Sequence, residues 1–397
     1  METLFGLPES VKFCEKCVVS NQRPSSVVES KFSKKKKTIE FDEYGICSAC
    51  RLHEAKDENI DWRSREEELV RLLDKHRSKD GSFDVVVPGS GGKDSIYVSN
   101  ELKTKYGMTP LTVTWPPHIY TDIGWKNFNA WLDMGFTNIS LTPNRELHRS
   151  MTKEAFLNLC HPFQPFILGQ KTIGPRVAAD WGIPLVMYGE SQAEGGSDIS
   201  EAMKPTMPPK YFTSDPNSTG TLRLGGVSVD EWRRQGAALS DLRLYLPLDP
   251  REAEKGQIEV HHYGYYHRWR PQDCYYYAVE NSEFMANPDR TEGTFSKYSS
   301  LDDKIDGFHY FTTYIKFGIG RTTYEAAQEI RNHHISREEA VMLVRKYDGE
   351  FPKKYFQEFL DYCDLNEEQF WKVIDKNRSP HLWANENGSW QLLHQVT

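Results

Sequence analysis

The chain has 397 residues, which is enough for two or three domains and a large hydrophobic core. Lysine and arginine total 49 against 57 aspartate and glutamate residues, and this formal net charge of −8 argues against a protein-wide electrostatic grip on nucleic acid. No apolar run is long enough to cross a bilayer, and the N-terminus lacks the basic start and apolar stretch of a signal peptide, so we expect a cytoplasmic protein without membrane contacts.

Residues 1–60 contain four of the seven cysteines as two pairs, Cys14-x-x-Cys17 and Cys47-x-x-Cys50. Clustered cysteines in a reducing compartment are better explained as metal ligands than as disulfides, and structural Zn²⁺ prefers four thiolates. The 29 residues between the pairs exceed the usual spacing, but a loop with the lysine run Lys34–Lys37 accommodates them at small entropic cost. We predict a zinc-ribbon-like domain; a redox CxxC and an iron–sulfur cluster remain alternatives.

Residues 61–195 show the pattern of an α/β domain. An amphipathic helix is expected over 62–78, and after it the short apolar runs "FDVVV", "LTVTW", "NISLT" and "IPLVMYGE" alternate with helical patterns. Strands that alternate with helices predict βαβ units and a parallel sheet, with ligands at the carboxyl ends of the strands.

Residues 89–95 form a glycine-rich turn directly after the first of these strands and before a helix. Glycines in that position allow backbone N–H groups to converge on an anion that the helix N-terminus also attracts, and phosphate is the natural ligand. The Walker pattern is not satisfied, because Lys93 is followed by Asp94 and not by Ser or Thr, so a kinase or GTPase is disfavoured.

The remaining chain divides at about residue 300. Residues 196–300 combine Pro- and Ser-rich loops with the aromatic run "HHYGYYHRWRPQDCYYYAVE", which could be either a substrate-binding wall or a core. Residues 301–397 are predicted to be a helical C-terminal region, in which Ser336 and Glu339 form a capping box. The scattered Cys160, Cys274 and Cys363 are interpreted as buried small residues.

The motif "SGGKDS" resembles the SGGxDS loop of the PP-loop ATP pyrophosphatases, which transfer AMP and not phosphate. The resemblance implies an adenine nucleotide α-hydrolase-like fold, in which Asp94 helps to hold Mg²⁺ and the rest of the loop binds the β and γ phosphates of ATP. The implied ATP-binding positions here are Pro88, Ser90, Gly91, Gly92, Lys93, Asp94 and Ser95.

The whole-chain layout resembles the bacterial N-acetyl sugar amidotransferases. The resemblance rests on "FCEKCVVSNQRP", "FDEYGICSACR", the PP-loop, "GIPLVMYGE" and "YIKFGIGRTTYEAAQEIRNHH" and extends over about residues 10–350. It implies conversion of the acetamido group of a nucleotide-linked N-acetyl sugar to an acetamidino group in lipopolysaccharide O-antigen, capsule or flagellar glycan biosynthesis. It also implies ammonia from a separate glutaminase subunit, because the chain has no recognisable glutaminase nucleophile motif.

Further candidate site residues lie outside the loop. Trp115 closes a strand and is a candidate to flank the adenine, although an ordinary core tryptophan is equally consistent. Glu190 lies at the carboxyl end of a strand and, with Lys93 and Asp94, is a candidate catalytic residue. Lys316 and Arg321 resemble late basic residues of the superfamily that contact pyrophosphate or AMP, with a solvated surface as the alternative.

Two other functions remain open from the sequence. A tRNA-modifying thiolase would need an RNA-binding face, which the acidic balance disfavours, and a catalytic cysteine, for which only Cys160 is a candidate. A zinc-ribbon scaffold that senses ATP without turnover is the non-enzymatic alternative.

Overall fold

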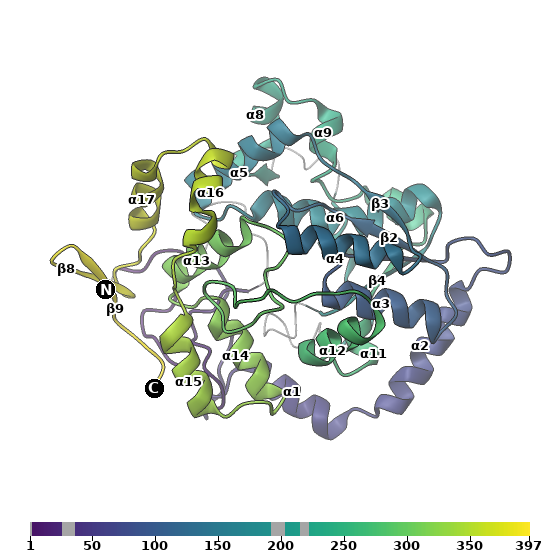
Figure 1. Cartoon of the computed structure of the whole chain (residues 1–397), viewed down its shortest axis with the longest axis horizontal. Helices are drawn as coiled ribbons and strands as arrows, with labels where there is room; N and C mark the ends of the chain where they lie inside the picture. The colour runs from purple at the N-terminus through teal and green to yellow at the C-terminus, as the bar shows by residue number, and fades with distance from the viewer. Residues whose placement is uncertain (1, 26–35, 192–202, 215–221) are drawn as a thin grey trace.

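The computed structural model describes residues 2–25, 36–191, 203–214 and 222–397 (Figure 1). Its centre is a five-stranded parallel sheet in the order β3-β2-β1-β4-β7. Four of the strands are those that the apolar runs predict, and the fifth was not predicted. The strands are β1 (Val85–Pro88), β2 (Pro110–Thr114), β3 (Thr137–Ser140), β4 (Leu185–Tyr188) and β7 (Glu259–His262).

Helices cover both faces of this sheet (Figure 1). Side chains alternate along β1, so that Val86 packs with α5 (Arg145–Leu159) and α6 (Gln164–Trp181) on one face. Val85 and Val87 point to the other face, where the covering helices are α2 (Trp62–His76), α3 (Lys93–Thr104), α11 (Tyr263–Tyr266) and α12 (Pro271–Asn281). The helix α4 (Asp122–Asp133) packs beside α3. This arrangement confirms the expected α/β class with a parallel sheet.

The segment from 196 to 300 is not separate from the sheet. Its strand β7 pairs with β4, and α12 packs against α3, so the sheet extends beyond the predicted domain limit at residue 195. The aromatic run contributes mostly to the core, since Tyr263, Tyr266 and Trp269 are buried there. The other elements of this segment are η2 (Pro209–Tyr211), β5 (Arg223–Leu224), β6 (Val227–Ser228), α8 (Val229–Arg234), α9 (Leu239–Arg243) and α10 (Pro250–Lys255).

The N-terminal cysteine module consists of residues 2–25, residues 36–47 and α1 (Ser48–Asn59). Outside α1 its backbone is held by isolated bridges, such as Phe41 with Cys47. Its apolar side chains form one cluster with Ala326, Ala327 and Ala340 of the C-terminal region. Segments from the two ends of the chain therefore lie side by side (Figure 1).

The C-terminal region is helical, as predicted, and the capping box of Ser336 and Glu339 is present. Its helices are α13 (Asp306–Phe317), α14 (Arg321–Arg331), α15 (Arg337–Tyr347), η4 (Lys353–Tyr355), α16 (Phe356–Cys363) and α17 (Glu367–Lys376). An unpredicted hairpin of β8 (Trp383–Glu386) and β9 (Ser389–Leu392) follows, turning at Asn387 and Gly388 with φ of +53° and +85°. No helix in the described ranges combines the length and apolar character that a membrane span requires.

Candidate active site

The glycine-rich loop joins β1 to α3 and is closely packed. Gly91 has φ of +81°, and a Cβ added there would lie 2.6 Å from the Cα of Phe128 in α4. A Cβ at Gly89 would lie 2.2 Å from the Cβ of Ser95. Both positions therefore require glycine. The loop leads directly into the N-terminus of α3, where free N–H groups attract an anion.

Lys93 and Asp94 begin α3 and form an ion pair, with Nζ 2.7 and 2.8 Å from the two carboxylate oxygens. Burial by itself would lower the pKa of Lys93, but the Asp94 carboxylate and other nearby acidic groups raise it. The ammonium group therefore stays charged while only 12% of the side chain is exposed, against 48% for Asp94. A buried cation beside an accessible carboxylate suits a polyphosphate that arrives with a metal ion.

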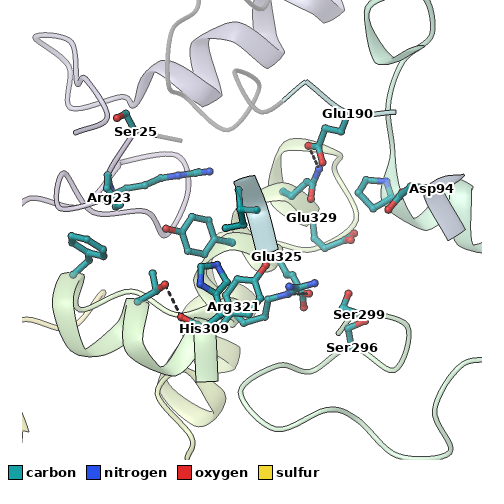
Figure 2. Close-up of a pocket in the computed structure, with 18 of the residues that line it drawn as sticks. Arg23, Ser25, Asp94, Glu190, Ser296, Ser299, His309, Arg321, Glu325 and Glu329 are labelled. Atoms are coloured by element: carbon teal, nitrogen blue, oxygen red, sulfur yellow. Dashed lines mark hydrogen bonds and ion pairs between the residues drawn. The ribbon is translucent and has the colours of Figure 1, made fainter. Parts of the chain in front are cut away.

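Both residues line a pocket of about 470 Å³, within the size range of small-molecule sites (Figure 2). Its walls come from the PP-loop, the end of β4, the helices α6, α13 and α14, the segment 295–299 and the cysteine module. Cations outnumber carboxylates in the lining, which favours an anionic ligand. The cations are Arg23, Lys36, Lys93, Lys171, Lys316, Arg321 and Arg331, and the carboxylates are Asp94, Glu190, Glu325 and Glu329.

The four predicted metal ligands come together at a buried site. All four Sγ atoms of Cys14, Cys17, Cys47 and Cys50 lie within 4.8 Å of one another. The Cys14–Cys50 and Cys17–Cys47 Sγ distances are 4.0 and 3.8 Å. Zn–S bonds of about 2.3 Å in a tetrahedron place the sulfur atoms roughly 3.8 Å apart, so the site fits one tetrahedral ion. A cluster of four irons would hold the thiolates farther apart.

Comparison with known proteins gives one family assignment. Residues 292–397 match the family model described as "LPS biosynthesis protein WbpG-like, C-terminal domain". The C-terminal region is similar to this family's domain and is called the WbpG-like domain below. This match supports the sugar-biosynthesis family that the sequence motifs resemble, and it covers α13 and α14, which form one wall of the pocket.

Other comparisons add little. No curated protein matches the chain. Among solved structures, the chain is similar to the "U34-tRNA thiolase NcsA from Methanococcus maripaludis with its [4Fe-4S] cluster", with 14% identity over 83% of this chain and 92% of that chain. The TM-score is 0.29, and a likeness this weak supports no inference about this chain.

The WbpG-like domain places two predicted basic residues in the pocket. Lys316 is buried, donates from Nζ to the Leu159 carbonyl at 2.9 Å and lies near the ring of Phe317. Arg321 donates from Nε to Glu325 at 2.5 Å, with its guanidinium over a neighbouring tyrosine ring. Neither residue is on the solvated surface that was the alternative interpretation.

Glu190 also lines the pocket, immediately after β4. Its Oε1 accepts a hydrogen bond from Nε2 of Gln328 at 3.0 Å, so the WbpG-like domain positions it (Figure 2). Glu190, Lys93, Asp94 and the two basic residues of the domain therefore converge on one cavity, as the sequence analysis expected for a single site.

The structure does not bring Trp115 to this pocket. The residue follows Leu111 and Val113 in alternation, so its side chain points to the same buried face of the sheet. Only 4% of it is exposed, and a Cβ at Gly169 of α6 would lie 2.3 Å from the indole ring. Trp115 is a core residue in this structure, and the adenine-flanking role has no geometric support.

The other loop residues support the loop without lining the cavity. Pro88 packs beside α6, where a Cβ at Gly174 would lie 2.7 Å from its Cγ. Ser95 donates from Oγ to the Gly92 carbonyl at 2.9 Å. The Ser90 side chain hydrogen-bonds Asp302, a carboxyl group whose pKa burial raises.

Several lining residues were not identified from the sequence. Arg23, Lys171, His161 and His309 belong to no local motif and reach the pocket only through the tertiary fold. The pocket-lining residues of α14 could have been found from the sequence, because these polar residues recur at helical spacing and mark one face of the helix. Those residues are Arg321, Tyr324, Glu325, Gln328, Glu329 and Arg331.

Proposed function

We propose that the chain is an ATP-dependent, AMP-forming amidotransferase that converts the acetamido group of an N-acetyl sugar to an acetamidino group. The observation that carries the proposal is the Lys93–Asp94 pair at the end of a glycine loop, opening into a cationic pocket walled by the WbpG-like domain. The product class fits lipopolysaccharide, O-antigen or flagellar glycan biosynthesis, since the family description names LPS biosynthesis.

The reaction splits one difficult substitution into two easier steps. The amide oxygen of the sugar attacks the α-phosphorus of ATP, which forms an O-adenylyl imidate and releases pyrophosphate. Ammonia then adds to the imidate carbon, AMP leaves with the former amide oxygen, and loss of a proton gives the amidine. Oxygen is thereby exchanged for NH at the cost of one ATP.

The protein mainly positions charges in this scheme. Loop N–H groups and Lys93 neutralise the departing pyrophosphate, and Asp94 would help to hold the Mg²⁺ that accompanies ATP. Lys316 and Arg321, which line the same pocket, would stabilise negative charge on the transferred adenylyl group. Glu190, which accepts a hydrogen bond from Gln328, would orient ammonia and accept its proton.

The cysteine site would hold structural Zn²⁺, because four buried thiolates at tetrahedral spacing are its preferred ligand set. A glutaminase subunit would supply ammonia, and the enzyme would act in the cytoplasm on a soluble, nucleotide-linked sugar.

A thiolase is the second candidate, because Cys160 lines the pocket. Its backbone is left-handed, with φ of +45°, at the end of α5. In that function Cys160 would carry a persulfide loaded by a separate persulfide donor, its outer sulfur would displace AMP from an adenylylated base of tRNA, and an external thiol would reduce the resulting disulfide to release the thiolated base.

The test is a product assay with ATP, Mg²⁺, excess ammonium and a panel of nucleotide-linked N-acetyl sugars, following AMP and the mass of the sugar. We expect AMP together with a sugar in which oxygen is replaced by NH. Asp94→Asn should abolish both products, whereas Asp289→Asn, an exposed aspartate outside the pocket, should not.

Cys160→Ser separates the two candidates. Amidination should survive this substitution, since no step of the proposed reaction uses a thiol. AMP that forms only with tRNA and a sulfur donor, and that disappears in Cys160→Ser, would replace the amidotransferase with a thiolase. A lack of AMP with every acceptor would favour the non-catalytic scaffold.

A further inference from the structure

Two arginines in the pocket have no carboxylate partner within the described residues. Arg23 comes from the cysteine module and Arg331 from the end of α14. The other arginine of the lining, Arg321, is paired with Glu325, and Lys93 is paired with Asp94. The two unpaired guanidinium groups therefore bring positive charge that nothing in the described protein compensates through an ion pair.

Their hydrogen-bonding capacity is also unused. Arg331 is only 7% exposed, yet its Nε and Nη1 atoms are buried without a hydrogen-bond partner. Arg23 likewise has a buried Nη1 without a partner, and its guanidinium lies over the ring of Tyr324 at 4.6 Å. Buried donors without acceptors are costly, so their persistence beside a cavity indicates that a ligand supplies the acceptors.

The positive charges of Arg23 and Arg331 also repel each other. Burial lowers the pKa of Arg23, and the charge of Arg331 lowers it further. Tyr324, Cys47 and Cys17 offset these effects only in part, so the pKa of Arg23 stays lowered, and an anion in the cavity would stabilise its charge.

Arg23 lies on the far side of the pocket from the glycine-rich loop. In Figure 2, Arg23 and Ser25 lie at one side of the pocket and Asp94 at the other, with Arg321 between them. Lys171 adds a third cation that forms no ion pair in the part of the chain the structure describes. One pocket therefore offers two regions for phosphate, and ATP needs only the one at the glycine loop.

We propose that Arg23 and Arg331 form a second anion subsite, which binds the diphosphate that links the N-acetyl sugar to its carrier. This inference rests on the proposed function and specifies its substrate class as a sugar diphosphate ester. Guanidinium groups suit this role because their planar donors bind phosphate oxygens in pairs. With the diphosphate at this subsite, the sugar extends toward the PP-loop, where its acetamido oxygen meets the α-phosphate of ATP.

The test measures binding without turnover. The full-length protein, saturated with a non-hydrolysable ATP analogue, is titrated with UDP-N-acetylglucosamine and with UDP by calorimetry. We expect both to bind the wild-type protein, and Arg23→Met and Arg331→Met to weaken this binding about tenfold to a hundredfold. Affinity for the ATP analogue should stay unchanged in both variants. Arg63→Met, an 89% exposed arginine on α2, is the matched control and should bind both ligands normally.

Two further measurements keep the result interpretable. Bound metal and circular dichroism show whether Arg331→Met has lost the cysteine site, and Arg23→Lys retains a folded, charged pocket with poorer diphosphate geometry. Arg23→Lys should lie between the wild type and Arg23→Met in UDP affinity. Loss of metal in Arg331→Met with unchanged UDP affinity would mean that this arginine serves only the thiolates, and would overturn the subsite.

The carrier and the reaction are tested separately. Binding of a short-chain polyprenyl diphosphate N-acetylglucosamine but not of UDP, with the same loss in Arg23→Met, would keep the subsite and assign a lipid carrier. UDP affinity unaffected by both methionine variants, or competition of UDP with the ATP analogue for one site, would refute the proposal. Arginine-dependent UDP binding without AMP formation would leave the subsite standing and remove the amidotransferase reaction.

Discussion

Replacement of Gly91 by alanine tests whether the loop geometry is as tight as the structure indicates. The substitution combines two costs, because φ is +81° and the new Cβ would lie 2.6 Å from the Cα of Phe128 and 2.8 Å from the Asn127 carbonyl oxygen. The left-handed backbone costs a non-glycine residue about 1–2 kcal/mol. Overpacking against backbone that cannot rotate away costs about 1–3 kcal/mol more. We therefore expect Gly91→Ala to lower the free energy of unfolding by about 2–5 kcal/mol.

Two other glycines separate the backbone cost from the packing cost. Gly182, at the end of α6, has φ of +67° with no atom within 4 Å of an added Cβ, so Gly182→Ala reports the backbone cost alone. Gly92 has φ of −74° and only the Ser90 Oγ at 3.7 Å, so Gly92→Ala should change stability least. Urea unfolding at pH 7 gives the three values. Gly91→Ala no less stable than Gly182→Ala would show that the loop is not pressed against α4, and would refute the reasoning.

Three further predictions concern the pocket and the metal site. Burial lowers the pKa of Lys171 from 10.5 to about 8, so its charged form destabilises the folded state. Lys171→Met should therefore raise the urea midpoint of unfolding at pH 7. This gain in stability should shrink between pH 8 and 10.5, because the wild-type amine loses its charge first in the folded and then in the unfolded state. An equal gain at all pH values would contradict the prediction. Cys14→Ser should reduce bound metal from one ion per chain to nearly none, measured by plasma mass spectrometry, and retention of metal would exclude the four-thiolate site. Trp115→Phe should lower stability by roughly 1–3 kcal/mol and leave affinity for an ATP analogue unchanged, whereas a selective loss of affinity would return the indole to the adenine site.

Features encoded in adjacent residues were predictable from the sequence. The valines before the glycine loop, the loop itself and the helix that follows are one continuous stretch, and the structure has them as β1, the loop and α3. The four cysteines were paired by spacing, and their convergence needed no knowledge of the rest of the fold. The hairpin at Asn387–Gly388 belongs to the same class, because that dipeptide is a strong turn signal, and it was overlooked.

Features that depend on distant contacts were not predictable in the same way. The strand β7 is four residues long and becomes a strand by pairing with β4, from which a long intervening segment separates it. The face of the sheet to which Trp115 points could be read from the sequence, since Val113 and Leu111 lie two and four residues before it, but the face that the pocket occupies could not. Arg23 could be assigned to the pocket only once the cysteine module was placed on α14.

The packing of the cysteine module against α14 explains how the metal site is connected to the pocket. Ala326 and Ala327 are fully buried in the shared cluster, and their small side chains allow the cysteine module to approach α14 closely. Arg23 then projects from the module over the ring of Tyr324 in the same helix, and Arg331 follows about two turns later on the same face of α14. A module without its metal has few regular elements to hold this position, since most of its backbone is irregular. The thiolate site therefore fixes one cationic wall of the cavity, the wall that carries Arg23.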